Sequence, residues 1–421
     1  MGYKTYTCPI GRTCGGCEWL AVPYPIQLRR KQEWTARLFE QVAREDGTEL
    51  APIVGVPGEP VAYRCKAATP FAPGPRGRVR SGFYAAGTHR IVACDECLVE
   101  DPRCRRILNE IAHTATKLRI PAYDEDRGTG LLRHAIVRVG WRTDEALLTV
   151  VTNGREMRHA DQFVAELRRR CPEVTSCVQN VNTRRTNAML GRETHVLWGS
   201  GVLADELLGC RFEVGPLSFY QTNPAQTETL YRLAIEAAGL ADGDRLLDAY
   251  CGCGTIGICA AAAARAAGAR VHVTGVETSA DAVARARRNA ELNGLAGAGA
   301  TATPGSTATP DPAAKSRSLT PAGTCVFHRA DATAWMARTD ERFDVIVLDP
   351  PRAGSTPEFL EGAVHLGPER IVYVSCNAET QARDLAILRK GGYRLVRLTP
   401  VDMFPHTKHV ETVVLMSRKD T

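Results

Sequence analysis

RLLDAYCGCGTIGICAAAAARAA, residues 245–267, is the stretch that decides the fold of this chain. An apolar run that ends at an acid, Asp248, is followed by a glycine-rich turn and then by an alanine-rich segment. The apolar run predicts a buried strand and the alanine-rich segment predicts a helix. Glycines between the two let the backbone turn sharply and let a ligand approach closely. The stretch therefore predicts the strand–turn–helix unit of a ligand-binding α/β domain.

Strand and helix patterns alternate along the rest of the C-terminal half, from about residue 216. Such alternation predicts a doubly wound, Rossmann-like parallel sheet, and we assign it to a domain at 216–421. Two further strands without a long helix between them are predicted in 393–419, as a β-hairpin-like addition to the sheet. Residues 296–323 are nearly all Ala, Gly, Thr, Pro and Ser, which predicts a flexible insertion. The other predicted strands are 245–250, 271–277, 324–331, 343–351 and 370–376, and the predicted helices are 224–240, 256–267, 279–294 and 356–365.

The N-terminal half has a different organisation. Residues 1–20 are rich in Cys and Gly and are expected to be irregular, and the apolar spacing in 24–46 predicts a helix. We group these as a segment at 1–49. Short β-type runs alternate with turns from there to about residue 215, so we expect a mixed α+β module at 50–215.

The net charge of +6 is concentrated in the first half of the 421 residues. Residues 1–215 hold 31 Lys and Arg against 25 Asp and Glu, whereas residues 216–421 hold 22 of each. Of those 31 cations, 27 are arginines, whose guanidinium groups match phosphates and stack on bases. This favours RNA binding by the 50–215 module. The alternative is that arginine merely replaces lysine in a GC-rich genome.

Localisation follows from what the sequence lacks. No apolar run approaches the roughly 20 residues needed to cross a bilayer, and the N-terminus has no secretory h-region. We therefore expect a cytoplasmic protein without membrane contact. Its fifteen cysteines argue against a disulfide scaffold and for thiols that act as ligands or nucleophiles.

Acidic residues are expected at the ends of the first three strands of the parallel sheet. Glu277 ends the second predicted strand, where a carboxylate can accept hydrogen bonds from both ribose hydroxyls. NAD-dependent dehydrogenases share this feature. Asp248, however, suits a cationic amino-acid moiety better than a pyrophosphate, and Asp331 is placed to meet an adenine amino group. These two acids favour S-adenosylmethionine over NAD as the ligand.

The motif DPPRAG, residues 349–354, follows the fourth predicted strand of this sheet. The carboxyl ends of such strands form the crevice in which open α/β sheets bind ligands. Two successive prolines remove two backbone donors and stiffen the turn, so Asp349 is held at a fixed angle toward a flat substrate. Amino-group methyltransferases use a related motif that continues with an aromatic residue, whereas Arg352 follows here.

Two further motifs carry groups capable of nucleophilic and acid–base chemistry. VSCN, residues 374–377, places Cys376 at the end of the fifth strand, where its thiolate can act as a nucleophile. The alternative is a buried core cysteine. MFPHTKHVE, residues 403–411, supplies three groups that can transfer a proton, namely His406, His409 and Glu411.

Taken together, these motifs resemble those of the RNA uracil-C5-methyltransferase family, which acts on tRNA and large-subunit rRNA. The matching segments extend over nearly the whole chain and include the N-terminal cysteines. They are FYQTNP (219–224), DAYCGCGTIG (248–257), GVE (275–277), DPPRAG (349–354), VSCN (374–377) and DMFPHTKHVE (402–411). The resemblance implies a class I methyltransferase fold for the C-terminal domain.

The resemblance also implies a reaction and roles for individual residues. Cys376 would add to C6 of uracil, which makes C5 nucleophilic enough to take the methyl group from S-adenosylmethionine. Glu411 would then remove the C5 proton, and Asp349 would hydrogen-bond the uracil edge and lie beside the cofactor. Phe219 would contact a base or simply pack. The residues that fall where the family contacts the cofactor are Gln221, Tyr250, Thr255, Glu277, Asp331 and Asp349.

The N-terminal cysteines suggest a metal centre. Cys8, Cys14 and Cys17 are closely spaced, and Cys94-x2-Cys97 supplies candidates for a fourth ligand. A zinc ribbon would use the 14/17 and 94/97 pairs, but such pairs normally lie much closer in sequence, and Cys8 would be left over. A [4Fe–4S] cluster held by four thiolates would use all three N-terminal cysteines.

The family resemblance bears on which of these cysteines bind the cluster. The pattern H-x-x-V-x4-C-x-V-x2-P, residues 89–102, selects Cys97 and leaves Cys94 incidental. We therefore expect a [4Fe–4S] cluster on Cys8, Cys14, Cys17 and Cys97, with a structural, RNA-facing role.

The overall expectation is a monomeric enzyme that forms 5-methyluridine in RNA, with 23S rRNA preferred over tRNA. A cytosine-C5 methyltransferase would also use cysteine addition at C6, but it places the nucleophile in a Pro-Cys or Thr-Cys context that this chain lacks. A non-catalytic iron–sulfur RNA-binding protein is the third possibility, and the presence of Cys376, Glu411 and Asp349 argues against it.

Overall fold

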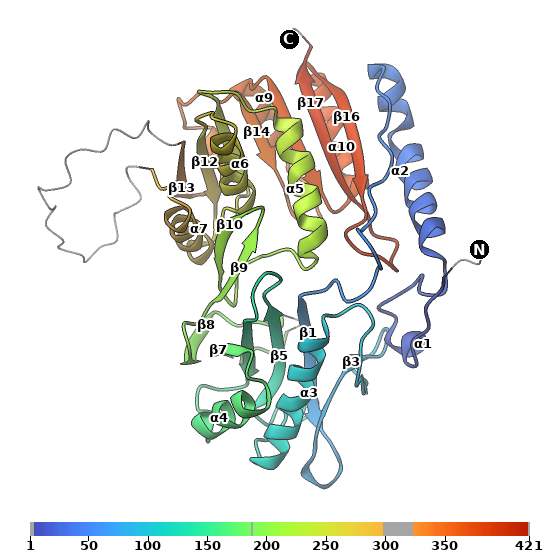
Figure 1. Ribbon diagram of the computed structural model, residues 1–421, viewed down its shortest axis with the longest axis vertical. Helices are drawn as coiled ribbons and strands as arrows, with labels where there is room; N and C mark the ends of the chain where they lie inside the picture. Colours follow the sequence, from blue (N-terminus) through green and yellow to red (C-terminus); the bar gives the residue numbers. More distant parts are fainter. Residues whose placement is uncertain (1–3, 187, 298–322, 420–421) are drawn as a thin grey trace, which may run out of the picture.

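The C-terminal half is built on a seven-stranded sheet (Figure 1). The computed structural model describes residues 4–186, 188–297 and 323–419, so the predicted insertion at 296–323 falls almost entirely outside the described residues. The strand order is β13-β12-β11-β14-β15-β17-β16, and β17 alone runs antiparallel to both of its neighbours. The doubly wound sheet and its terminal hairpin are thus confirmed. The strands are β11 (Arg245–Ala249), β12 (His272–Glu277), β13 (Thr324–Arg329), β14 (Val345–Leu348), β15 (Arg370–Ser375), β16 (Tyr393–Val401) and β17 (Glu411–Arg418).

Helices cover both faces of this sheet because its strands are apolar on both sides. Val372 and Val374 of β15 belong to one buried core, whereas Ile371 and Tyr373 belong to the other, as the alternation of a strand requires. The first core takes residues from α5 (Pro224–Ala238), α6 (Thr255–Ala266) and α7 (Ala280–Leu292). The second takes residues from α8 (Ala332–Met336), α9 (Pro357–Leu366) and α10 (Ala378–Lys390). Of these helices, α8 and α10 lie beyond the predicted elements.

The N-terminal module contains a six-stranded sheet of order β2-β1-β5-β6-β7-β8, backed by α3 (Pro102–Lys117) and α4 (Ala160–Arg170). It is a mixed α+β unit, as the sequence predicts. The hairpin of β9 (Leu203–Leu207) and β10 (Cys210–Val214) instead packs on α6 and α7 of the C-terminal half. The remaining strands are β1 (Lys66–Pro73), β2 (Val79–Ser81), β3 (Phe83–Tyr84), β4 (Ile91–Val92), β5 (Leu132–Val139), β6 (Ala146–Thr152), β7 (Val174–Val181) and β8 (Glu193–Trp198), and η1 (Pro75–Gly77) is a short 3-10 turn.

The N-terminal helix α2 (Tyr24–Asp46) has the predicted bounds, yet it packs on the C-terminal sheet beside β16 (Figure 1). Its residues Phe39 and Ala43 belong to the same core as β15 and α9. The preceding residues contain one short helical turn, α1 (Gly11–Cys14), where the sequence predicts irregular structure. None of the described helices is both long and apolar enough to cross a membrane.

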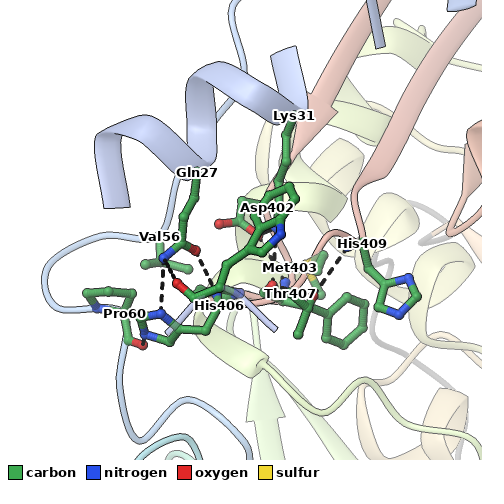
Figure 2. A network of polar contacts seen from close by, with 12 residues as sticks. Gln27, Lys31, Val56, Pro60, Asp402, Met403, His406, Thr407 and His409 are labelled. Atoms are coloured by element: carbon green, nitrogen blue, oxygen red, sulfur yellow. Dashed lines mark hydrogen bonds and ion pairs between the residues drawn. The ribbon is translucent and has the colours of Figure 1, made fainter. Parts of the chain in front are cut away.

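Polar side chains of α2 hold the loop that joins β16 to β17, residues 402–410 (Figure 2). The Lys31 ammonium lies 2.6 Å from the Asp402 carboxylate, and both side chains are fully buried. Gln27 accepts a hydrogen bond from the backbone N–H of His406 at 2.8 Å and contacts the His406 ring at 3.1 Å. The loop leads directly into Glu411, so α2 fixes the backbone that precedes this residue.

The fixed loop generates a stability prediction. Lys31→Met should destabilise the protein by about 3–5 kcal/mol, because it leaves the buried Asp402 carboxylate without its partner. Lys31→Met combined with Asp402→Asn should recover most of the loss, since no unpaired charge remains. Urea unfolding measures both, with the exposed Arg29→Gln on the same helix as the control. A double variant no more stable than Lys31→Met would contradict this account.

Candidate active site

The carboxyl ends of β11, β12, β14 and β15 meet at one edge of the sheet, where the strand order reverses between β11 and β14. Ligand crevices in open α/β sheets form at such a reversal. A cavity of about 690 Å³ lies there. Eight of the residues that the sequence predicts for catalysis or cofactor contact line it, namely Gln221, Tyr250, Thr255, Glu277, Asp331, Asp349, Cys376 and Glu411.

Three acids line one part of the cavity. Asp248 is buried and accepts a hydrogen bond from the backbone N–H of Gly257 at 2.9 Å, which ties β11 to the start of α6. Glu277 ends β12, and its Oε1 accepts hydrogen bonds from Thr278 and Ser279. Its Oε2 receives none from the described residues. Asp331 caps α8, two residues beyond the end of β13, rather than ending that strand.

The turn after β11 is shaped by a left-handed backbone. Tyr250 has φ of +76°, an uncommon conformation for a residue with a side chain, and its ring packs on Phe359 at 4.9 Å between centroids. Thr255, the first residue of α6, shares a 2.8 Å hydrogen bond with the buried Tyr231 hydroxyl. These contacts hold the turn open beside the cavity.

The antiparallel pairing of β15 with β17 brings two distant motifs together. Ser375 of β15 pairs with Thr412 of β17. In the same register, Cys376 lies across from Glu411, because the next residue on one strand faces the previous residue on the other. Asp349 follows β14, the neighbour of β15 on its other side. The thiol and the two carboxylates therefore share one end of the cavity.

Burial dominates the electrostatics of this end. It raises the pKa of Glu411 to about 8, with a further contribution from Asp349, while Arg352 opposes the rise. Burial likewise raises the pKa of Asp349. The pKa of Cys376 rises to about 11 because of burial and the two carboxylates, again opposed by Arg352. Buried groups with strongly raised pKa values in a cleft are typical of a catalytic site.

Glu411 also has an unsatisfied hydrogen-bonding atom. Its Oε2 is buried and has no hydrogen-bond partner among the described residues. An orphaned carboxylate oxygen is costly in a packed core. Its position in the cavity points to a role toward a ligand.

The two histidines of the 403–411 motif differ from each other. His406 is buried outside the cavity, and both ring nitrogens are engaged, one with Gln27 and the other with the carbonyl oxygen of Pro60. It holds the backbone and is unavailable as a base. His409 is half-buried and lines a neighbouring cavity that also touches Cys376. Phe219 is 67% exposed at the rim of the first cavity, so its ring is not a core side chain.

Some cavity residues escape prediction from the sequence. Arg64 lines the cavity but comes from the segment just before β1 in the N-terminal module. Tyr231 reaches it from α5. Neither residue lies in a motif, and only the tertiary fold brings them to the strand ends, so the sequence alone carries no signal for them.

The N-terminal cysteines lie near one another beside the β3–β4 hairpin. The backbone N–H of Ala86 donates to the carbonyl oxygen of Thr13 at 3.0 Å, which joins the α1 segment to that hairpin. Burial raises the pKa of Cys17 to about 12, and the other contributions come mainly from three nearby thiols, those of Cys97, Cys14 and Cys8. Even so, no three Cys, His, Asp or Glu side chains among the described residues are arranged to hold a metal ion.

This chain is similar to known RNA methyltransferases over nearly its whole length. The model of the tRNA (uracil-5-)-methyltransferase family matches residues 208–419. An uncharacterized RNA methyltransferase of Halalkalibacterium halodurans is 36% identical over 98% of this chain and 83% of its own length. A similar protein of Oceanobacillus iheyensis is 38% identical over the same shares of the two chains.

A solved structure is similar over nearly the whole chain. The tRNA (uracil-54, C5)-methyltransferase of Pyrococcus abyssi, in complex with S-adenosyl-L-homocysteine, superposes with a TM-score of 0.71 at 26% identity. The match covers 95% of this chain and 85% of the archaeal enzyme. The similarity therefore includes both the N-terminal module and the C-terminal domain.

The raised pKa of Glu411 generates a prediction about stability and pH. A carboxyl group whose folded pKa exceeds its unfolded pKa contributes stability at low pH and loses it as pH rises toward the folded pKa. Glu411→Gln has no carboxyl group to ionise, so its stability does not fall in this way as pH rises. The variant should match the wild type near pH 4, below the unfolded pKa, and exceed it by a few kcal/mol, about 1.4 kcal/mol per pKa unit, near pH 8.

Unfolding curves across this pH range test the prediction, with Glu361→Gln, an exposed carboxylate on α9, as the control. A stability difference that does not change with pH would show that Glu411 titrates normally.

Proposed function

Because this chain belongs to the tRNA (uracil-5-)-methyltransferase family of RNA methyltransferases, we propose that it forms 5-methyluridine in RNA with S-adenosylmethionine as methyl donor. The observation that carries the proposal is the meeting of Cys376, Glu411 and Asp349 in one cavity beside the acids of the β11 and β12 ends. A thiol and two carboxylates at a cofactor crevice fit covalent catalysis on a flat, weakly nucleophilic ring.

The residues around the β11 and β12 ends can be matched to the ribose, the adenine and the amino-acid moiety of S-adenosylmethionine. The Glu277 carboxylate has a free oxygen for ribose hydroxyls, and Asp331 lies beyond the end of the neighbouring strand, where adenine would sit. Burial raises the pKa of Asp248 to about 7, and a bound cationic amino-acid moiety would favour its ionised form. Gln221, Tyr250 and Thr255 complete the lining of the cavity.

The reaction begins when the Cys376 thiol loses its proton to solvent, favoured by the Arg352 guanidinium, and the thiolate sulfur bonds to C6 of uracil. The C5–C6 double bond gives its electron pair to the ring, and the resulting enolate has carbanion character at C5. C5 then takes the methyl group from the sulfonium, which releases S-adenosylhomocysteine. Glu411 accepts the C5 proton, the double bond re-forms, and the thiolate leaves C6. Asp349 hydrogen-bonds the uracil edge throughout.

The electrostatics support this division of roles. Without RNA, the raised pKa of Cys376 keeps the thiol protonated and therefore unreactive toward adventitious electrophiles. The Arg352 guanidinium favours the thiolate. The raised pKa of Glu411 makes its carboxylate a stronger base than an exposed one, which suits removal of a carbon-bound proton.

The RNA substrate is proposed from two lines of support. The family resemblance seen in the sequence includes enzymes of large-subunit rRNA, whereas the matching family model and the solved relative from Pyrococcus abyssi are named for tRNA. We propose 23S rRNA as the leading substrate and tRNA as the second candidate, bound by an enzyme that acts as a monomer. Mapping 5-methyluridine in both RNAs from a deletion strain separates them.

We also propose that Cys8, Cys14, Cys17 and Cys97 hold a [4Fe–4S] cluster. The set is supported by the nearness of Cys8, Cys14 and Cys97 to Cys17, since burial and all three thiols raise its pKa. Burial and the Glu100 carboxylate raise the pKa of Cys97, and the backbone N–H groups of Val99 and Glu100 oppose the rise. Cys94 instead donates a hydrogen bond to the carbonyl oxygen of Glu96 at 3.1 Å. The cluster would stabilise the N-terminal segment and supplies no electrons to methyl transfer.

The nucleophile assignment gives a first functional prediction. Cys376→Ala should lower turnover on the order of 10⁴-fold or more while leaving affinity for S-adenosylhomocysteine unchanged, since only the covalent step is lost. Wild-type enzyme should form a denaturant-stable adduct with 5-fluorouridine RNA, because fluorine cannot leave as a proton. Gel electrophoresis detects the adduct, and calorimetry measures the affinity for S-adenosylhomocysteine. Cys65→Ala, at a half-buried cysteine, is the control. Methylation by Cys376→Ala would refute the mechanism.

The cluster assignment gives a second functional prediction. Anaerobically purified protein should be brown and contain about four iron and four sulfide per chain. Serine at any of the four proposed ligands should bleach it, whereas Cys94→Ser should leave the colour intact. Metal analysis and absorption spectra measure this outcome. Fresh anaerobic protein that contains zinc and no iron would overturn the assignment.

A further inference from the structure

A second cavity, of about 480 Å³, also borders the nucleophile. Cys376 and Arg352 line both cavities, so the two adjoin at the thiol. Its other walls come from α2, from the segment before α2, from the 402–410 loop and from the start of α10. The proposed reaction uses none of these walls.

Two indole rings form apolar walls of this second cavity. Trp34 lies on α2 and Trp19 on the segment that precedes it, and both are only partly buried. The Arg30 guanidinium stands 5.8 Å from the centroid of the Trp19 ring. Tryptophan and arginine surfaces at a partly open site are the usual platforms on which unstacked nucleic-acid bases pack.

Cations dominate the charge of the cavity. Arg30, Arg352 and Lys408 are exposed, and the first two make no ion pair among the described residues. Lys408 approaches Glu18 only at 3.8 Å, at the surface. The one carboxylate in the lining is Glu379, in the first turn of α10. The site therefore offers aromatic walls together with free positive charge.

We propose that this cavity binds the nucleotide adjacent to the target uridine in the RNA strand. Its base packs against Trp19 and Trp34, and its phosphate is held by Arg30, Arg352 and Lys408. The inference rests on the proposed function, because the thiol shared by the two cavities fixes where the target uracil lies. Lys31 lines the same cavity but is already paired with Asp402, so it contributes packing rather than phosphate contact.

A binding experiment with abasic RNA tests the proposal. In a Cys376→Ala background, which prevents adduct formation, affinity is measured for a short labelled RNA with one uridine between adenosines. Two further RNAs carry an abasic nucleotide on the 5′ or the 3′ side of the uridine. Trp19→Ala and Trp34→Ala should each weaken binding of the intact RNA about tenfold and have little effect on one of the abasic RNAs. Trp34→Phe should retain most of the affinity.

The charged residues have a matched control on the same helix. Arg30→Gln should reduce affinity and lower the salt dependence of binding by about one ion, whereas Arg29→Gln, paired with Glu33 outside the cavity, should change neither. Circular dichroism confirms that each variant is folded.

Tryptophan variants that weaken all three RNAs equally, or none of them, would overturn the proposal. Failure of the proposed function is a separate result, in which wild-type enzyme forms no 5-methyluridine in RNA that it binds.

Discussion

The antiparallel ladder between β15 and β17 is the constraint on which the site depends. In a purely parallel sheet, the strand next to β15 would end at the crevice with its own last residue. The reversed β17 instead begins there, so its first residue, Glu411, faces Cys376 across the register set by Ser375 and Thr412. Two groups that our proposed mechanism uses in succession on one ring are thereby held side by side by the backbone hydrogen bonds of the ladder.

That arrangement requires support from outside the sheet. The 402–410 loop must turn the chain from β16 back into β17, and the buried Lys31–Asp402 pair and the Gln27–His406 contacts hold it to α2 (Figure 2). The segment that precedes α2 carries three of the proposed cluster ligands, and its Trp19 backbone N–H donates to His406 at 2.9 Å. The segment that carries these cysteines is therefore hydrogen-bonded to the loop that leads to Glu411, so a cluster bound there, as we propose, would stabilise that loop.

The sequence predicted local elements well because apolar spacing and glycine turns are local signals. Helix 24–46 and the strand ends that carry Asp248, Glu277 and Cys376 lie where the patterns place them. The sequence did not predict that α2 packs on the C-terminal sheet, because Lys31 and Asp402 are 371 residues apart and no pattern pairs them. For the same reason His406 remained a candidate base until the fold showed both ring nitrogens engaged. Arg64 lines the site but belongs to the N-terminal module, and no sequence motif contains it.

We propose that Glu411 removes the C5 proton after Cys376 has added to uracil, and mass spectrometry of one variant tests this step. The Glu411→Gln variant is incubated with S-adenosylmethionine and ordinary uridine RNA, and the masses of the denatured products are measured. We expect a covalent protein–RNA complex that already carries the transferred methyl group, because addition and methylation proceed while elimination is blocked. Turnover at the wild-type rate with no trapped species would contradict it, and an adduct trapped only by substitution of His409 would assign the base to that residue.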